Sequence, residues 1–341
     1  MEIPSILLNR ILSEAAKRKV SDLHLTVGSL PMARIDNQLA PFTESEILTK
    51  EILDKIIDSL LNDKEKELLK LNKSVATVKT MAGNFRFKIN IFFQKELPAI
   101  SFHYVSSIMK NLNELNIPES FAELIKKNSG LLIIAGAYGS GRTTTIAAFI
   151  EEVNKTINKN IVTIENPIEY LFVSKKSIIT QRQVEVDVNS IVDGLKFCLD
   201  EDVDLVYVNG IKSEETITDA MPLIIKLAAG NCLVLLELNS DSSVRTIEKL
   251  ISYLQKNTTV EAARHDIADI LLGVIIQKLV TKKGGGLVLA SEVLLNNSAV
   301  KSLIREGKNY QIENIIQTSR QEGMIHMTKS LSDLTDKGVI N

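Results

Sequence analysis

The stretch GLLIIAGAYGSGRTTT, residues 130–145, decides the fold. It opens with an uninterrupted apolar run, Leu131 to Ala135, which is typical of a strand buried on both faces of a sheet. A glycine-rich segment follows, and the residues from Thr143 to Val153 then show the spacing of a helix. A buried strand, a glycine-rich turn and a helix in this order predict a loop that wraps phosphate oxygens.

The glycine-rich segment matches the pattern GxxxxGK[ST] at each fixed position except the lysine. Glycines let backbone amides converge on phosphate oxygens at the positive end of the following helix. We therefore expect ATP as the ligand, with the Thr143 hydroxyl offered to Mg²⁺. The alternative is a glycine-rich turn that only starts a helix. The predicted nucleotide-binding residues are Gly136, Ala137, Tyr138, Gly139, Ser140, Gly141, Arg142, Thr143 and Thr144.

Arg142 stands where the pattern has lysine. Lysine places a compact, flexible ammonium between phosphates, whereas the guanidinium of arginine is planar, forked and bulkier. The charge is kept and the geometry is changed, so we expect phosphate binding that is weakened rather than abolished. The alternative is that Arg142 points outward and the loop binds nothing.

The rest of the C-terminal two-thirds alternates strands with helices, as in a sheet covered by helices. Beyond Ser242 the sequence predicts mostly helix, including Val260 to Leu272, with an interruption at Gly284 to Gly286, where a turn precedes a strand from Leu287 to Leu295. The predicted buried strands after the first are Asn160 to Ile164, Leu205 to Val208 and Leu233 to Leu238.

The N-terminal third predicts a smaller α+β unit. Helical spacing covers Ile6 to Ala15 and Glu51 to Leu71, and a turn at Met81 to Asn84 joins two strands. We expect an N-terminal domain at 1–106, a linker at 107–118 and a nucleotide-binding domain at 119–341, opening with a helix from Glu119 to Lys127. The predicted strands are Leu23 to Leu25, Met32 to Ile35, Val75 to Lys79, Asn84 to Phe93 and Ile100 to Val105.

The composition narrows the classes of partner. Forty basic and 42 acidic side chains give a formal charge of −2, which disfavours a nucleic-acid surface. No apolar run is long enough to span a membrane and the first residues do not resemble a signal peptide, so we expect a cytoplasmic location. Cys198 and Cys232 lack CxxC spacing and are interpreted as buried free thiols, without a disulfide or a metal.

Several further segments resemble one family in order and spacing. They are SDLHLTVGSLPMARIDNQL at 21–39, RFKIN at 86–90, TIENPIEY at 163–170, AVKSLIRE at 299–306 and the C-terminal residues from Gln317 to Ile340. With the phosphate loop, they resemble the PilT branch of the type II and type IV secretion ATPase superfamily, hexameric motors that retract type IV pili. The resemblance implies an α/β fold: an N-terminal PAS-like α+β domain followed by a RecA-like P-loop NTPase domain with a helical C-terminal extension.

The resemblance also implies partners. Motors of this type hold each nucleotide between the C-terminal domain of one subunit and the N-terminal domain of the next. We therefore expect a homo-hexamer or a mixed ring with an intact paralogue, bound to an inner-membrane pilus platform protein and peripherally associated with the pilus machine. ATP and Mg²⁺ are the implied cofactors, and no nucleic acid is expected.

Positions that carry the family's hydrolytic chemistry are replaced here. The glutamate that polarises the attacking water corresponds to Gly210, and the histidine of the histidine box corresponds to Asn239. The family's acidic box, here TIENPIEY at 163–170, has Asn166 in place of aspartate. Two N-terminal arginines that reach the nucleotide correspond to Glu96 and His103, while Arg86 persists.

Few acidic side chains remain as candidates for the chemistry. Glu165 in the acidic box, beside Glu169, is the candidate catalytic residue, and Thr143 and Asp204 are the candidate Mg²⁺ ligands. Glu237 is either a displaced catalytic carboxylate or a stray polar residue in an apolar strand. The chain's histidines at positions 24, 265 and 326 are interpreted as structural.

Three functions stay open at this point, and with them the question of whether the chain is an enzyme. The first is a ring subunit that binds ATP with weak or lost hydrolysis and acts in or regulates pilus retraction. The second is a working retraction ATPase with rearranged catalytic residues, and the third an assembly subunit that binds no nucleotide. A nucleic-acid translocase is disfavoured by the near-neutral charge.

Overall fold

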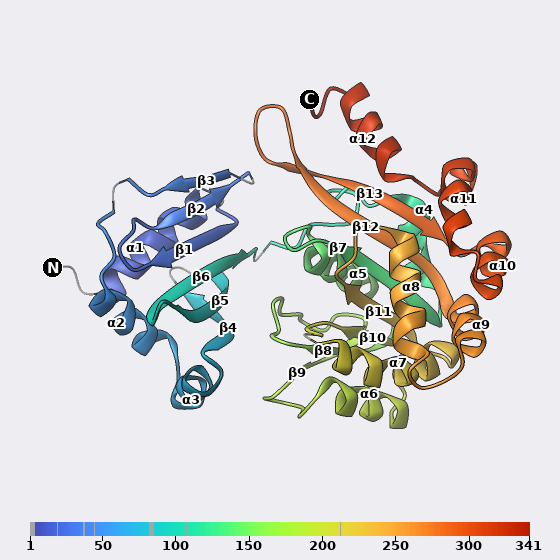
Figure 1. Ribbon diagram of the computed structural model, residues 1–341, viewed down its shortest axis with the longest axis horizontal. Helices are drawn as coiled ribbons and strands as arrows, with labels where there is room; N and C mark the ends of the chain where they lie inside the picture. Colours follow the sequence, from blue (N-terminus) through green and yellow to red (C-terminus); the bar gives the residue numbers. More distant parts are fainter. Residues whose placement is uncertain are drawn as a thin grey trace. The chain divides into compact units, whose positions relative to one another are not determined.

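A computed structural model describes residues 4–18, 20–36, 38–43, 45–81, 85–106, 108–211 and 213–341 (Figure 1). The chain divides into two compact units, Met1–Ile108 and Met109–Asn341. Each unit has its own sheet and its own apolar core. In the described ranges no helix is both long and apolar enough to cross a membrane.

The N-terminal unit is an antiparallel sheet with the strand order β3-β2-β1-β6-β5-β4 and helices packed on it. Alternate residues of β1 and β5 face the core, among them Leu23 and Phe87, which is the period of a half-buried strand. Its elements are α1 (Pro4–Lys17), β1 (Asp22–Thr26), β2 (Met32–Ile35), β3 (Gln38–Pro41), α2 (Lys50–Leu60), α3 (Asp63–Asn72), β4 (Ser74–Met81), β5 (Phe85–Gln94) and β6 (Leu97–Val105).

The helix predicted from Glu51 to Leu71 is wrong, because the structure has two helices there, α2 and α3. Asn62 stops the first and caps the second: its side chain accepts from the Glu65 amide at 2.9 Å, and the Glu65 carboxylate accepts from the Asn62 amide at 2.9 Å. This reciprocal pair is a capping box. The exposed strand β3 was not predicted, and the predicted turn falls partly on residues 82–84, which lie outside the described residues.

The C-terminal unit is a sheet in the order β13-β12-β7-β11-β10-β8-β9, parallel except for the pair β12–β13. Its strands are β7 (Gly130–Gly136), β8 (Asn160–Glu165), β9 (Ile178–Gln183), β10 (Leu205–Val208), β11 (Leu233–Leu238), β12 (Leu271–Thr281) and β13 (Leu287–Leu295). Its helices are α4 (Glu119–Ala122), α5 (Arg142–Thr156), α6 (Ile191–Asp200), α7 (Glu214–Ala229), α8 (Ser243–Leu254), α9 (Val260–Ile270), α10 (Ser298–Glu306), α11 (Ile312–Thr318) and α12 (Met327–Asp336).

Both faces of this sheet are buried. Leu132 and Ile134 pack with Phe149 of α5 on one face, whereas Leu131 and Ile133 pack with residues of α6 to α10 on the other. Two covered faces explain why the strands read as continuous apolar runs. The segments at 205–208 and 233–238 are strands with the bounds predicted.

The expectation of helix from Val260 to Leu272, and of mostly helical structure before Gly284, is wrong at 271–281. There β12 pairs parallel to β7 and antiparallel to β13. Its β-branched run Val274 to Ile276 suits a strand, and both pairings bury it. The strand β9 was also missed, and the segment Glu119 to Lys127 is α4 followed by a 3-10 turn, Glu123–Lys126.

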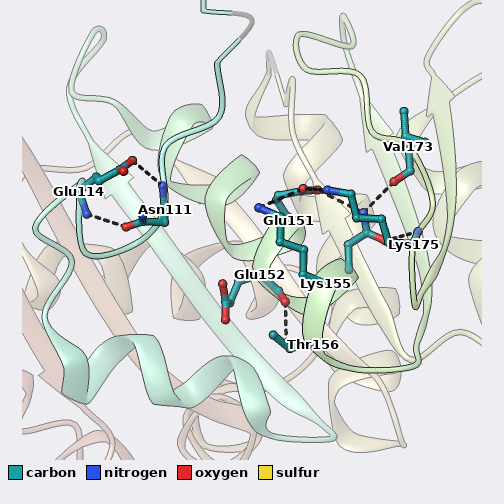
Figure 2. A network of polar contacts seen from close by, with 9 residues as sticks. Asn111, Glu114, Glu151, Glu152, Lys155, Thr156, Val173 and Lys175 are labelled. Atoms are coloured by element: carbon teal, nitrogen blue, oxygen red, sulfur yellow. Dashed lines mark hydrogen bonds and ion pairs between the residues drawn. The ribbon is translucent and has the colours of Figure 1, made fainter.

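Polar contacts tie the end of α5 to the segment between the acidic box and β9 (Figure 2). The Lys175 ammonium bonds the Glu151 carboxylate. The Asn154 side chain donates to the Val173 carbonyl and accepts from the Lys175 amide, both at 2.9 Å. Because α5 starts at the glycine-rich loop, these bonds fix the segment that follows the acidic box to the helix that carries the loop.

Candidate nucleotide-binding site

The glycine-rich loop joins β7 to α5, and its glycines are required by the backbone. Gly139 and Gly141 have φ angles of 74° and 87°, in the left-handed region that other residues rarely adopt. A Cβ on Gly136 would lie 2.6 Å from the carbonyl oxygen of Gln277 on β12. The loop conformation therefore depends on glycine at all three positions.

The loop lies at the carboxyl ends of parallel strands, where open α/β sheets hold their ligands. The first-turn amides of α5 have no partner within the helix, which makes them anion donors. Among the described residues, the Ser140 hydroxyl and the Gln277 side-chain oxygen are buried without a hydrogen-bond partner. Buried polar atoms left unpaired beside a loop of this shape fit a site that takes a polar ligand.

Arg142 points inward, toward the end of β11, and not outward. Its Nη1 donates to the Leu238 carbonyl oxygen at 2.7 Å, and its Nε lies 3.3 Å from the Glu237 carboxylate. The side chains of Arg142 and Glu237 are only 14% and 9% exposed. The guanidinium is therefore held by two acceptors of the protein itself.

Glu237 is the centre of this cluster. Its Oε2 accepts from the Thr143 hydroxyl at 3.3 Å and from the Tyr207 hydroxyl at 3.1 Å. Alternation along the strands puts Glu237 and Tyr207 on the face that α5 covers, in line with Leu233 and Leu205. Burial and the Glu237 charge raise the pKa of Tyr207 well above its usual range, so the phenol stays protonated and donates.

Glu165 ends β8 and is buried on the same face of the sheet. Its carboxylate accepts from the Thr163 hydroxyl at 2.6 Å and from the Gln181 amide at 3.4 Å. Burial, together with the charge of Glu169, raises the pKa of Glu165 to about 7. The acidic box touches the loop helix, since the hydroxyls of Thr144 and Tyr170 lie 3.1 Å apart.

Gly210, which follows β10, packs against the acidic box. Its φ is 83°, and an added Cβ would lie 2.6 Å from the Asn166 Cβ and 2.8 Å from the Asn166 backbone nitrogen and oxygen. Real Cβ atoms essentially never approach other heavy atoms this closely. The backbone here therefore excludes a side chain.

Asp204 lies at the amino ends of the parallel strands, opposite to the ends that carry the phosphate loop. It precedes β10, and its carboxylate accepts from the Asn160 amide at the start of β8 at 2.7 Å. The length of β10, at about 3.3 Å per residue, separates Asp204 from the carboxyl ends of the strands. The structure thus places Glu237 beside Thr143, and does not bring Asp204 there. No three His, Cys, Asp or Glu side chains in the described part group as a metal site.

The remaining replaced positions are spread over both units. Asn239 is exposed just after β11, where its carbonyl oxygen accepts from Lys249 at 2.8 Å. In the N-terminal unit Glu96 occupies an exposed turn, and the His103 ring bonds the Asp22 carboxylate at 2.9 Å. Burial opposes this, yet the His103 bond and charge lower the pKa of Asp22. Cys198 and Cys232 are buried and free, as predicted.

Sequence reasoning missed two polar residues of this site. Tyr207 lies inside an apolar strand, and Gln277 inside a segment taken for helix; Gln277 donates to the Thr145 hydroxyl at 2.7 Å. Their signal was a polar atom in an otherwise apolar run.

Strand, glycine loop, helix and a threonine beside a carboxylate together define the P-loop class of nucleotide-binding site.

Comparison with known proteins identifies the family. The type II/IV secretion system protein family matches residues 2–338, and the chain belongs to it. PilT of Pseudomonas aeruginosa, a type IV pilus retraction ATPase, is 32% identical over 338 residues, covering 98% of this chain and 95% of PilT. The type IV pilus ATPase PilU of the same organism is 28% identical over 326 residues, covering 94% and 82%.

A solved structure agrees with the fold. The crystal structure of the pilus retraction motor PilT with bound ADP superimposes with a TM-score of 0.81 at 33% identity, covering 98% of this chain and 94% of that one. The family and the fold class expected from the sequence are thereby confirmed.

Proposed function

We propose that the chain is a PilT-like ring subunit that binds ATP at the loop from Gly136 to Thr144 and hydrolyses it weakly or not at all, acting in or regulating pilus retraction. The observation that carries this proposal is the packing of Gly210. At the position that corresponds to the family's water-polarising glutamate, the backbone of Asn166 leaves no room for a side chain. Without a carboxylate at this position, the attacking water lacks the base that the family's glutamate supplies.

Nucleotide binding is supported by the parts of the site that remain. The loop glycines, the first turn of α5 and the unpaired Ser140 hydroxyl fit phosphate oxygens. Thr143 is the residue we propose toward Mg²⁺, and Asp204 leaves the set because it lies at the amino end of β10. A bound magnesium ion would neutralise charge on the phosphates.

We further propose the assembly implied by the family. The chain forms a ring of six, alone or mixed with an intact paralogue, in the cytoplasm at the inner-membrane pilus machine, where a platform protein is its partner. A subunit that binds without turnover can serve such a ring by occupying a position while intact neighbours supply the hydrolysis.

A second function is favoured by Glu165. A carboxyl with a pKa of about 7 is suited to accept a proton at neutral pH, so this residue could act as base in a rearranged but working ATPase. The third function, an assembly subunit with an empty loop, is separated from both by a titration of the full chain with a non-hydrolysable ATP analogue.

The deciding experiment is steady-state phosphate release by the purified full-length chain. We expect a rate near background and far below about 1 per second, the lower end of ordinary enzymes. Gly136→Val, which closes the loop against Gln277, measures contaminating activity. A wild-type rate clearly above that control, and lost in Glu165→Gln, would replace the first function by the second.

A further inference from the structure

Glu237 places a negative charge inside a site built for negative ligands. Its carboxylate lies 3.3 Å from the Arg142 Nε and 3.3 Å from the hydroxyl of Thr143. Both groups belong to the phosphate loop and the first turn of α5, where polyphosphate and its metal are held in this class of fold. A buried carboxylate here repels phosphate oxygens, because screening by water is small at 9% exposure.

The ion pair also neutralises Arg142, the cationic side chain of the phosphate loop. The Arg142 guanidinium and the Glu237 carboxylate sum to zero charge, and the Leu238 carbonyl takes a further guanidinium N–H. A phosphate that approaches this loop therefore meets a neutral pair, not a positive side chain. Buried charged partners are stable together and unfavourable apart, so neither is released without a replacement.

We infer that Glu237 is an internal competitor of the nucleotide: the loop accepts a polyphosphate only when phosphate oxygens replace the Glu237 carboxylate on Arg142. This inference rests on the proposed nucleotide binding. Two consequences follow from the charges. Nucleotide without metal binds weakly, because the displaced carboxylate stays within the site. Added Mg²⁺ increases nucleotide affinity more in this protein than it would in the same loop without the Glu237 charge, because Mg²⁺ screens Glu237 from the phosphates.

The test compares ADP affinity by calorimetric titration of the full chain in EDTA and in excess Mg²⁺. Glu237→Gln keeps the size and the acceptor for Tyr207 and removes the charge. In EDTA it should tighten ADP binding about tenfold or more, as expected for loss of a charge-assisted pair, and the gain should shrink in Mg²⁺. In an Arg142→Gln background the same substitution should gain less, since no guanidinium is freed.

Glu151→Gln is the matched control, because Glu151 is a buried carboxylate of α5, the helix that begins with Arg142, and it bonds Lys175 away from the loop. It should leave ADP affinity unchanged. Thermal unfolding of every variant checks the fold, and Glu237→Ser serves if the glutamine variant does not fold.

The outcomes separate the inference from the proposed function. Wild-type binding that Glu237→Gln leaves unaltered overturns the inference alone. Weaker Mg²⁺-ADP binding in Glu237→Gln also overturns it, and makes Glu237 a metal ligand. Binding only in Glu237→Gln supports the inference while the unmodified chain loses its proposed ligand. No binding in any variant removes both.

Discussion

The carboxyl ends of β7 and β11 carry the phosphate loop, Arg142 and Glu237, whereas those of β8 and β10 carry Glu165 and Gly210. In the first region every charge is paired and the backbone is shaped by glycines for a ligand. In the second region the Glu165 carboxyl is buried with a pKa of about 7, and Asn166 leaves no room for a side chain at Gly210. Under the proposed function, the comparison teaches that nucleotide binding and hydrolysis depend on different strand ends: the loop after β7 keeps a backbone that fits a ligand, whereas Asn166 occupies the space next to Gly210.

The largest expected effect on this contrast between the two regions comes from substitution of Gly210. Gly210→Glu should lower the free energy of unfolding by about 3 kcal/mol or more, from positive φ and overpacking against Asn166 together. It should not raise phosphate release. Urea unfolding and the same release assay provide the two measurements.

Gly284 offers a control for the strain alone. It has a φ of 85°, close to that of Gly210, but nothing lies within 4 Å of an added Cβ. Gly284→Ala should lose only about 1 kcal/mol, the penalty of the left-handed backbone, while Gly210→Ala should lose clearly more. Equal losses would show that the Asn166 contact yields easily and that a side chain fits at this position.

Glu165 sharpens the contrast through pH. Its folded-state pKa is raised to about 7 from an ordinary value of 4.5. The unfolded chain therefore ionises first, and the group destabilises the fold increasingly as pH rises from 4.5 to about 7, with a constant penalty above. Glu165→Gln should be more stable than wild type at pH 8, by on the order of 1 to 3 kcal/mol, and lose that advantage toward pH 4.5.

Chemical denaturation at pH 5, 6, 7 and 8, spanning the interval set by the raised pKa of about 7, checks this dependence. Glu67→Gln on α3 is an exposed control and should show no such trend. A stability difference between Glu165→Gln and wild type that does not change with pH would mean that Glu165 stays ionised in the fold.

The smallest effect concerns the metal. Thr143→Val should weaken nucleotide binding in Mg²⁺ by about tenfold and hardly change it in EDTA, because it removes one metal-directed oxygen. Asp204→Asn, at the amino end of β10, should not change the nucleotide affinity in Mg²⁺ or in EDTA. A loss of Mg²⁺ dependence in Asp204→Asn would place the metal away from the phosphate loop.

The parts of the structure that depend on short-range features can be predicted from the sequence, and those that depend on long-range pairing cannot. The loop at Gly136 to Thr143 is predictable because glycine spacing, the strand before and the helix after are all short-range features. The segment Leu271 to Thr281 is not, because a buried strand and a buried helix share the same apolar composition, and pairing with β7 and β13 decides between them.

Site residues follow the same division. The place of Thr143 in a motif predicts its position at the phosphate loop, whereas the position of Asp204 at the amino end of β10 is not predictable, because a sequence does not say at which end of a strand a flanking residue meets the loop. The partners of Arg142 could not be predicted either. Glu237 follows it by 95 positions, and only the parallel pairing of β7 with β11 brings the two together.

The contact between Gly210 and Asn166 has an evolutionary consequence. A single substitution that introduces a carboxylate at 210 places its Cβ 2.6 Å from the Asn166 Cβ, so it lowers stability before it can contribute to hydrolysis. If hydrolysis is weak or lost, as we propose, selection opposes this first step unless the acidic box moves as well. Under the proposed function, a carboxylate at 210 therefore requires a coupled change at Asn166, whereas single substitutions in the phosphate loop are the more accessible route to altered nucleotide binding.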